Sequence, residues 1–230
     1  IEKPIHYIDE NISKTLKVFE FAKKRKIKKI FYASSSSVYG DKGIFPTKEK
    51  VPLDQPISIY GVTKVATENI AYYYFKIFNI NSIGFRFFTV FGPYGRPDMS
   101  IFIFIKALLK NKIINLNNYG NNFRDFTFID TIIDYLIEVF LQTKLKTSFF
   151  HIFNIGGEKN INLKNLIKKL EILTKKKAKI RKRPRINLDP DYSLADNKKI
   201  KKFVRKKIIH NFDYGLKQTV LWMVNNIKKL

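Results

Sequence analysis

Residues 27–40 have the sequence IKKIFYASSSSVYG, an apolar run that passes directly into four serines. The run 27–34 has the length and apolar content of a buried strand, and residues 12–26 before it are predicted to form a helix with a strongly basic end. Ligands of parallel α/β sheets bind at the carboxyl ends of the strands. We therefore expect Ser34–Ser37 to lie at a ligand-binding edge.

Strand and helix patterns alternate along the rest of the chain. Residues 40–56 are rich in glycine and proline and are expected to form a loop, and residues 175–192 to form a basic linker. Further helices are predicted at 58–79, 100–111 and 131–143, after residue 163 and as a closing pair that includes Trp222, and further strands at 82–91, 113–116, 123–130 and 150–156. This alternation indicates an α/β protein with a largely parallel sheet.

The chain is strongly basic, with 44 Lys and Arg against 19 Asp and Glu and a formal net charge of +25. Such a charge suits a nucleic-acid-binding domain, because cations neutralise phosphates. Only eight of the 44 are arginine, however, and arginine is the residue that contacts phosphate and guanine bidentately. We interpret the charge mainly as solvated helix faces that attract anionic small molecules such as nucleotides. Nucleic-acid binding stays open as an alternative.

Composition excludes several kinds of site. The chain has no cysteine, which removes disulfides, thiolate metal sites and a cysteine nucleophile, and which fits a reducing cytoplasm. His6, His151 and His210 are far apart in sequence, so no metal site is expected. No apolar run approaches the ~18 residues of a membrane span, and the first residues have no signal-peptide pattern. We therefore expect a cytoplasmic location and no membrane partner.

A second motif, YGVTK, occupies residues 60–64 at the start of a predicted helix, which places Tyr60 and Lys64 one turn apart on one face. A lysine ammonium beside a phenol favours the phenolate, and a phenolate can act as a general base. By itself the spacing is more typical of an exposed Tyr and Lys on a surface helix, because YxxxK occurs by chance in a lysine-rich chain. The serine cluster favours the catalytic interpretation, because a serine hydroxyl there could hold a substrate oxygen beside Tyr60.

Five segments in order resemble a known superfamily. They are SSSSVYG (34–40), YGVTK (60–64), RFFTVFGPYGRPDM (86–99), FRDFTFID (123–130) and FNIGG (153–157). They are similar to the extended short-chain dehydrogenase/reductases and to the NAD-dependent epimerases and dehydratases among them. Within that group the pattern most resembles the nucleotide-sugar epimerases that act on UDP-glucuronate, and the resemblance covers nearly the whole chain.

The resemblance implies a Rossmann-like doubly wound parallel sheet with NAD as cofactor, and a smaller C-terminal region that binds a UDP-sugar. Residues 1–92, together with strands near 123–156, would form the cofactor and catalytic part, and residues 93–230 mainly the substrate part. The family's glycine-rich NAD-binding turn has no counterpart in the 230 residues, so we expect the sequence to lack an N-terminal part. The complete enzyme would be a homodimer.

The resemblance also implies roles for individual residues. The catalytic residues would be Ser35, Tyr60 and Lys64, the cofactor-binding residues Asn11, Tyr60, Lys64 and Phe88, and the substrate-binding residues Ser35, Ser36, Ser37, Thr89, Arg96, Arg124 and Asp189. Arg124 would bind the diphosphate of the nucleotide, which suits a bidentate guanidinium. An ion pair between Arg124 and its neighbour Asp125 is not expected, because adjacent residues of a strand point to opposite faces.

Two segments depart from the family pattern. Leu188-Asp189 stands where the family has a glycine–aspartate pair, which makes the uridine side of the pocket the weaker part of the resemblance. His210-Asn211-Phe212 replaces a glycine–tyrosine turn, a change we expect to affect only the surface.

The implied reaction interconverts UDP-glucuronate and UDP-galacturonate. Tyr60 would remove the proton of the sugar 4-hydroxyl while NAD accepts the hydride from C4, and both would return to the other face of the 4-keto sugar, with Ser35 stabilising the oxygen. Residues 34–40 contain no Asp or Glu, which favours an epimerase over a dehydratase or decarboxylase. UDP-glucose, or another epimerase or dehydratase substrate, is the alternative within the family. An inactive fragment and a nucleic-acid-binding domain are the alternatives outside it.

Overall fold

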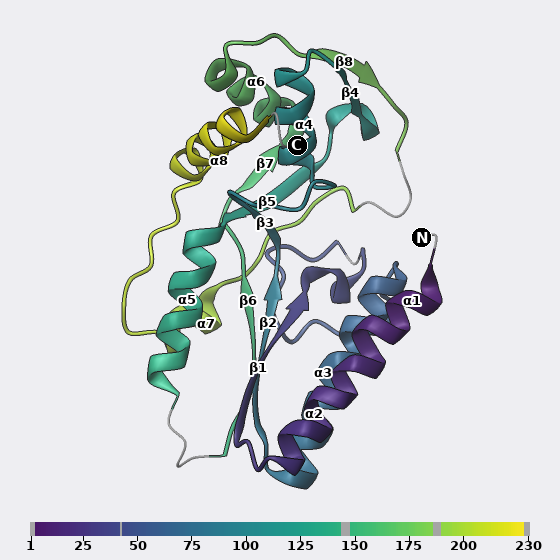
Figure 1. Ribbon diagram of the computed structural model, residues 1–230, viewed down its shortest axis with the longest axis vertical. Coiled ribbons are helices and arrows are strands. Elements are labelled where there is room, and N and C mark those ends of the chain that lie inside the picture. Colours follow the sequence, from purple (N-terminus) through teal and green to yellow (C-terminus); the bar gives the residue numbers. More distant parts are fainter. Residues whose placement is uncertain (1–2, 42, 144–147, 186–189, 228–230) are drawn as a thin grey trace. The chain divides into compact units, whose positions relative to one another are not determined.

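The serine run ends a strand of a parallel sheet in the computed structural model, which describes residues 3–41, 43–143, 148–185 and 190–227 (Figure 1). In this sheet β1 (Lys29–Ser35) pairs with β2 (Asn81–Phe87), and β2 pairs with β6 (Phe150–Ile155). The register places Ser35 opposite Phe87 and Phe87 opposite Ile155. All three strands therefore end at one edge, and the serines follow from it.

The chain divides into two compact units whose segments alternate along the sequence. Unit 1 comprises Ile1–Phe87, Glu138–Ile155 and Asp196–Arg205, and unit 2 comprises Phe88–Ile137, Gly156–Ala195 and Lys206–Leu230. From the sequence, residues 1–92 are assigned mainly to cofactor binding and catalysis and residues 93–230 mainly to substrate binding. That assignment of ligands to parts of the chain stays a prediction.

Two long helical segments run beside each other in unit 1 (Figure 1). The first consists of α1 (Pro4–Ile8), a π-helical turn at Asp9–Ser13 and α2 (Lys14–Lys24), and the second is α3 (Ile59–Phe78). The side chain of Ser58 caps α3 by accepting the Gly61 N–H at 3.0 Å, and the helix ends where Asn79 is left-handed. Their shared core consists of Phe19, Ala22, Ala71, Tyr74 and Ile80. A short helix, α7 (Lys198–Phe203), packs on β6.

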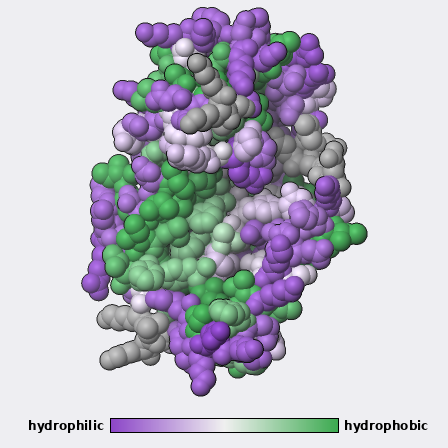
Figure 2. Space-filling view, in the orientation of Figure 1, coloured by the Kyte–Doolittle hydropathy of each residue, from purple (hydrophilic) through white to green (hydrophobic). Residues whose placement is uncertain are grey.

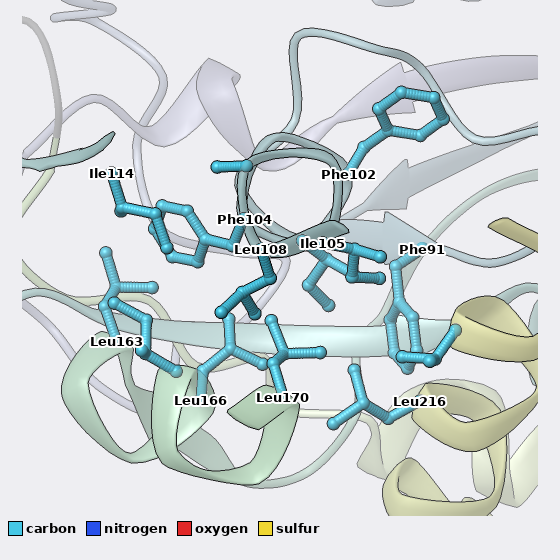
Figure 3. Packing of buried hydrophobic residues seen from close by; sticks show 14 of the residues in the cluster. Phe91, Phe102, Phe104, Ile105, Leu108, Ile114, Leu163, Leu166, Leu170 and Leu216 are labelled. Atoms are coloured by element: carbon cyan, nitrogen blue, oxygen red, sulfur yellow. The ribbon is translucent and has the colours of Figure 1, made fainter. Parts of the chain in front are cut away.

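Unit 2 is built on two small sheets. In one, β5 (Phe123–Phe128) pairs parallel with β3 (Thr89–Phe91) and antiparallel with β7 (Asn160–Asn162), and in the other β4 (Ile113–Leu116) pairs parallel with β8 (Lys179–Lys182). The helices are α4 (Ser100–Leu109), α6 (Leu163–Thr174) and α8 (Phe212–Asn226). They enclose one apolar core, in which Leu108 of α4 points toward Leu166 and Leu170 of α6 (Figure 3).

One helix carries a row of exposed apolar side chains. α5 (Ile129–Gln142) contains the boundary between the two units. Apolar side chains gather over it in Figure 2, and Ile133, Ile137, Phe140 and Leu141 are between 44% and 69% exposed. Neither α5 nor any other helix in the described ranges is long and apolar enough to span a bilayer.

The predicted α/β class with largely parallel sheets is confirmed, and three local predictions need correction. The helix predicted from residue 12 begins earlier, at Pro4, whose fixed φ suits the first helical turn. The strand predicted over 82–91 is two strands, because the chain leaves the first sheet at Phe88 and β3 pairs with β5. The linker predicted over 175–192 contains β8, which pairs through its backbone with β4 although all four of its residues are exposed.

Truncation of a core leucine in α6 is expected to destabilise unit 2. Leu166 is fully buried, so Leu166→Ala should lower the free energy of unfolding by about 2–5 kcal/mol through lost burial and a residual cavity. Ile172 on the same helix is 77% exposed, and Ile172→Ala should change that free energy by less than about 0.5 kcal/mol. Trp222 of α8, the only tryptophan, reports urea unfolding of this unit by fluorescence. Equal unfolding midpoints for the two variants would contradict this account of the core.

Candidate active site

The serines after β1 form a tight turn. Ser36–Tyr39 is a short 3-10 helix, and the buried Ser35 caps it: Ser35 Oγ accepts the Ser37 N–H at 3.2 Å and donates to Ser37 Oγ at 3.2 Å. Gly40 closes the turn with φ of +64°, a conformation that favours glycine, and a side chain there would collide with the Gln55 carbonyl. The hydroxyls of Ser35 and Ser37 are thereby held at the carboxyl edge of the sheet.

The first turn of α3 lies directly against this serine turn. A Cβ on Gly61 would stand 2.5 Å from the Ser37 carbonyl oxygen, so only glycine permits this approach of helix and turn. Tyr60 is the residue before Gly61 and is half-buried, and its ring meets the ring of Tyr7 edge to face at 6.2 Å. The contact fixes the start of the helix that carries Tyr60 to the turn that carries the serines.

Lys64 is held between α3 and β1. Its Nζ donates to the Ala33 carbonyl oxygen at 3.0 Å and lies 5.7 Å from the centroid of the Tyr60 ring. Burial lowers the pKa of the Lys64 ammonium from its usual range. A partly desolvated cation beside a phenol stabilises the phenolate, so the pair has the chemistry of an acid–base group.

Asn11 belongs to the π-helical turn Asp9–Ser13, a distortion that is frequent at functional sites. Asn11 Nδ2 donates to Thr63 Oγ1 at 3.0 Å, and Thr63 Oγ1 donates to the Tyr60 carbonyl at 2.8 Å. Thr67 Oγ1 donates to the backbone carbonyls of Thr63 and Asn11 at 3.0 and 3.4 Å. The segment that contains Asn11 is thus tied to the helix that carries Tyr60.

A buried ion pair fixes α3 on the sheet. The Arg86 guanidinium of β2 donates through Nε and Nη2 to the carboxylate of Glu68 at 2.8 and 2.6 Å, and both side chains are at most 5% exposed. Ser34 Oγ donates to Glu68 Oε1, and Arg86 Nη1 donates to Tyr39 Oη, which donates to Asn154 Oδ1. Burial raises the pKa of Tyr39 to about 12, so its phenol stays neutral. For Arg86, burial alone lowers the guanidinium pKa, but the bonds to Glu68 raise it overall.

Sequence reasoning missed this network. Its signal in the sequence is a single arginine, Arg86, inside the apolar run 82–91, and an acidic residue, Glu68, one turn after Lys64. Charged residues are almost never fully buried unless they are paired, so each predicts a partner for the other.

The other predicted site residues lie in unit 2. Phe88 is buried, and Thr89 begins β3. Arg96 is exposed, and its guanidinium forms a bidentate pair with Asp98, in which Nε is 3.0 Å from Oδ1. A substrate carboxylate at Arg96 would therefore share the guanidinium with Asp98. Asp189 lies outside the described residues.

Arg124 and Asp125 lie on opposite faces of β5, in accordance with the alternation of side chains along a strand. Arg124 is half-buried, with Nη1 2.9 Å from the Phe123 carbonyl oxygen. Asp125 is fully buried, and its carboxylate accepts the backbone N–H groups of Gly157 and Ala195, the latter at 2.8 Å. Burial raises the pKa of Asp125 to about 7, against the effect of these two hydrogen bonds. Asp125 thus joins three segments of unit 2.

The structure therefore brings Asn11, Ser35–Ser37, Tyr60 and Lys64 together in unit 1, and places Phe88, Thr89, Arg96 and Arg124 in unit 2. In the described part of the chain, no group of three or more His, Asp and Glu side chains could hold a metal ion.

Known proteins resemble the chain in sequence and in structure. The sequence profile of the NAD dependent epimerase/dehydratase family matches residues 1–156. A UDP-glucuronate 4-epimerase from Thermodesulfobacterium geofontis is 38% identical over an alignment of 232 positions that covers 99% of this chain and 69% of that protein. An uncharacterized protein from Methanocaldococcus jannaschii is 40% identical over 98% of this chain and 68% of its own.

A similar fold occurs in a solved structure. The crystal structure of UDP-glucuronic acid 4-epimerase from Bacillus cereus in complex with UDP-glucuronic acid and NAD is 31% identical, with a TM-score of 0.88 over 95% of this chain and 68% of that one. The family resemblance and the Rossmann-like fold predicted from the sequence are confirmed.

Removal of one charge of the buried ion pair is expected to cost more than removal of one charge of an exposed pair. Glu68→Gln leaves the Arg86 guanidinium buried without its counter-ion and should lower the free energy of unfolding by about 3–5 kcal/mol. Asp98→Asn breaks the exposed pair with Arg96 and should cost at most about 1 kcal/mol. Urea unfolding followed by far-UV circular dichroism measures both. Glu68→Leu combined with Arg86→Met should recover part of the loss, and an equal cost for the two single variants would refute the role of burial.

The free energy of unfolding of unit 2 is expected to depend on pH through the protonation of Asp125. Its folded-state pKa of about 7 lies above the ordinary 3.8, so its stabilising contribution is complete below pH 4 and is lost as the pH rises through 7. Relative to Asp125→Asn, the wild-type free energy of unfolding should fall by roughly 4 kcal/mol between pH 4 and pH 8, at 1.36 kcal/mol per unit of pKa. Trp222 fluorescence in urea measures this difference. A pH-independent difference in the free energy of unfolding between wild type and Asp125→Asn would contradict the assignment.

Proposed function

Because this chain belongs to the NAD dependent epimerase/dehydratase family, we propose that it is a UDP-sugar 4-epimerase that interconverts UDP-glucuronate and UDP-galacturonate. The observation that carries the proposal is the position of Lys64 Nζ, 3.0 Å from the Ala33 carbonyl and 5.7 Å from the centre of the Tyr60 ring. This places a cation, a phenol and the serine turn at one edge of the sheet. Epimerases among the similar proteins support the reaction class.

Tyr60 would move the proton of the reaction. Its phenolate oxygen takes the proton of the sugar 4-hydroxyl as that carbon is oxidised, and gives it back when the carbon is reduced. Lys64 stabilises the phenolate, and Ser35 Oγ holds the sugar oxygen by a hydrogen bond as its charge changes. The hydrogen bonds of Ser35 Oγ with the hydroxyl and the backbone N–H of Ser37 hold the Ser35 hydroxyl at the carboxyl edge of the sheet before the substrate binds.

NAD is the cofactor of the proposed reaction, and when bound it accepts a hydride from C4 of the sugar and returns it. The half-buried Lys64 cation and the hydroxyl of Tyr60 suit the nicotinamide ribose, and Asn11 and Phe88 are proposed as further contacts on the nicotinamide side. The 230 residues contain no GxGxxG turn, so the residues assigned to the cofactor belong to its nicotinamide half.

The remaining polar residues would recognise the UDP-sugar. In unit 2, Arg124 is proposed to bind the diphosphate, with Asp189 on the uridine side and Thr89 and Arg96 toward the sugar. In unit 1, Ser36 and Ser37 are proposed as neutral donors to the sugar. Arg96, whose guanidinium also pairs with Asp98, is proposed to bind the carboxylate of a uronic acid, which a neutral hexose lacks; this favours UDP-glucuronate over UDP-glucose.

Loss of the phenol should abolish turnover and spare binding. Tyr60→Phe should lower kcat for epimerisation of UDP-glucuronate by at least about 100-fold, since general acid–base catalysis contributes that much or more. Affinity for UDP should stay nearly unchanged, because the phenol takes no part in uridine recognition. Tyr73→Phe, at a 52% exposed position on the same helix, is the matched control and should keep wild-type turnover.

Chromatographic separation of UDP-glucuronate from UDP-galacturonate, with NADH followed by absorbance, provides the readout. Substantial turnover by Tyr60→Phe, or release of NADH in stoichiometric amounts, would contradict the proposed reaction cycle. A larger kcat/KM for UDP-glucose than for UDP-glucuronate would overturn the substrate while leaving the reaction class in place.

A further inference from the structure

A cavity that includes none of the residues assigned to epimerisation lies along the outer edge of β6 in unit 1. Its volume is about 590 Å³, within the range of small-molecule sites. Three segments line it: the loop after Thr47, the strand β6, and α7 together with Asp196, which lies two residues before the helix. The lining residues are Lys48, Glu49, Lys50, Phe150, Ile152, Asp196, Lys198, Lys199 and Lys202.

The lining is far more basic than the chain as a whole. Five of its nine residues are lysine, whereas 36 of the 230 residues of the chain are. The five lysines face two carboxylates, which leaves a formal excess of three positive charges. Each carboxylate is engaged by a backbone amide: Glu49 Oε1 accepts the Asn154 N–H at 2.9 Å, and Asp196 Oδ1 accepts the Lys198 N–H at 2.8 Å.

The walls of the cavity are held in place by hydrogen bonds. Lys199 Nζ donates to the Ile152 carbonyl at 2.8 Å, which joins α7 to the strand. The loop is joined to the same strand, because the Thr47 carbonyl accepts from Asn154 Nδ2 at 2.8 Å. The Glu49 carbonyl accepts from the buried Arg86 at 2.9 Å. The lysines of the loop and of α7 are therefore carried by fixed backbone, which lowers the entropic cost of binding a ligand.

The strand contributes an apolar wall. Phe150 and Ile152 are both half-buried, and the ring of Phe150 packs edge to face on that of Tyr72 at 5.2 Å and lies 5.7 Å from that of Phe75. Burial lowers the pKa of the Lys199 ammonium, so this cation is only partly solvated and gains from an anionic partner. The cavity thus presents cations on two sides and an aromatic and aliphatic surface on the third.

We propose that this cavity binds a nucleoside polyphosphate, with the phosphates between the lysines of the loop and α7 and the base against Phe150 and Ile152. Three or four negative charges match the excess charge of the lining, and a planar base matches its apolar wall. The site goes beyond the proposed epimerase function, because none of its residues is assigned to that reaction.

Unit 2 has a basic groove of its own, which serves as a control for the cavity in unit 1. It has a similar volume, about 570 Å³, and is lined by Lys168, Glu171, Ile172, Lys175, Lys176 and Lys177. Lys177 is 92% exposed and lies 3.8 Å from the carboxylate of Glu171. The groove lacks an aromatic wall and a lysine bonded to a strand, so we expect it to attract anions only through general charge.

Calorimetric titration of the whole protein with adenosine triphosphate at 150 mM salt tests the proposal. Combined Lys50→Ala, Lys198→Ala and Lys202→Ala should weaken binding at least tenfold, while the bond from Lys199 to Ile152 that supports the fold is retained. Combined Lys168→Ala, Lys176→Ala and Lys177→Ala removes the same charge from unit 2 and should change affinity less than twofold. Far-UV circular dichroism checks that both variants are folded.

Three outcomes would overturn the proposal. Equal loss of affinity in the two triple variants would mean general charge attraction, and unchanged affinity in the first would place the nucleotide at another site, the epimerase residues included. Inorganic triphosphate should bind at least fivefold more weakly than adenosine triphosphate, and equal affinity would remove the base from the proposal. Because the readout is binding, failure of the epimerase assay leaves this test unaffected.

Discussion

The buried ion pair between Arg86 and Glu68 ties α3 to the sheet of unit 1. Removing two charges from water costs several kcal/mol per ion, and only full satisfaction of their hydrogen bonds makes such a pair tolerable. Here Ser34, Tyr39 and the Glu49 carbonyl complete it, so β1, β2, α3 and the loop after Thr47 must all take their observed positions at once. A shift of α3 by one residue along the sheet would leave a bare charge in the core.

This requirement reaches the candidate site through the geometry of a helix. Tyr60, Lys64 and Glu68 are spaced by four residues and lie on one face of α3. Once Glu68 is fixed to β2, the two preceding turns are fixed with it, and Lys64 meets the end of β1. The close approach allowed by Gly61 adds a second point of attachment near Tyr60. The buried pair thus fixes where α3 places Tyr60 and Lys64 relative to the sheet edge. Apolar side chains of equal volume would fill the same space but would not fix this register.

Much of this arrangement follows from local sequence signals, and the remainder depends on contacts between distant segments. Apolar runs and helical spacing predicted β1, α3 and β4 well, and the YGVTK spacing predicted that Tyr60 and Lys64 share a face. The break at Phe88 was not predictable, because residues 87–91 contain no glycine or proline, and only the pairing of β3 with β5 reveals it. β8 has a basic sequence typical of a linker and is a strand only because β4 is beside it. The catalytic and binding roles of individual residues stay predictions.

The side chains along β6 also bear on how copies of this protein meet in solution. A strand at the end of a sheet offers unpaired amides and carbonyls, on which a second chain can add a strand and begin aggregation. On β6 the Ile152 carbonyl is occupied by Lys199, and the Asn154 amide is occupied by Glu49. An incoming strand would have to displace both and would approach a row of lysines of its own sign. The edge therefore acts as a barrier to intermolecular strand pairing.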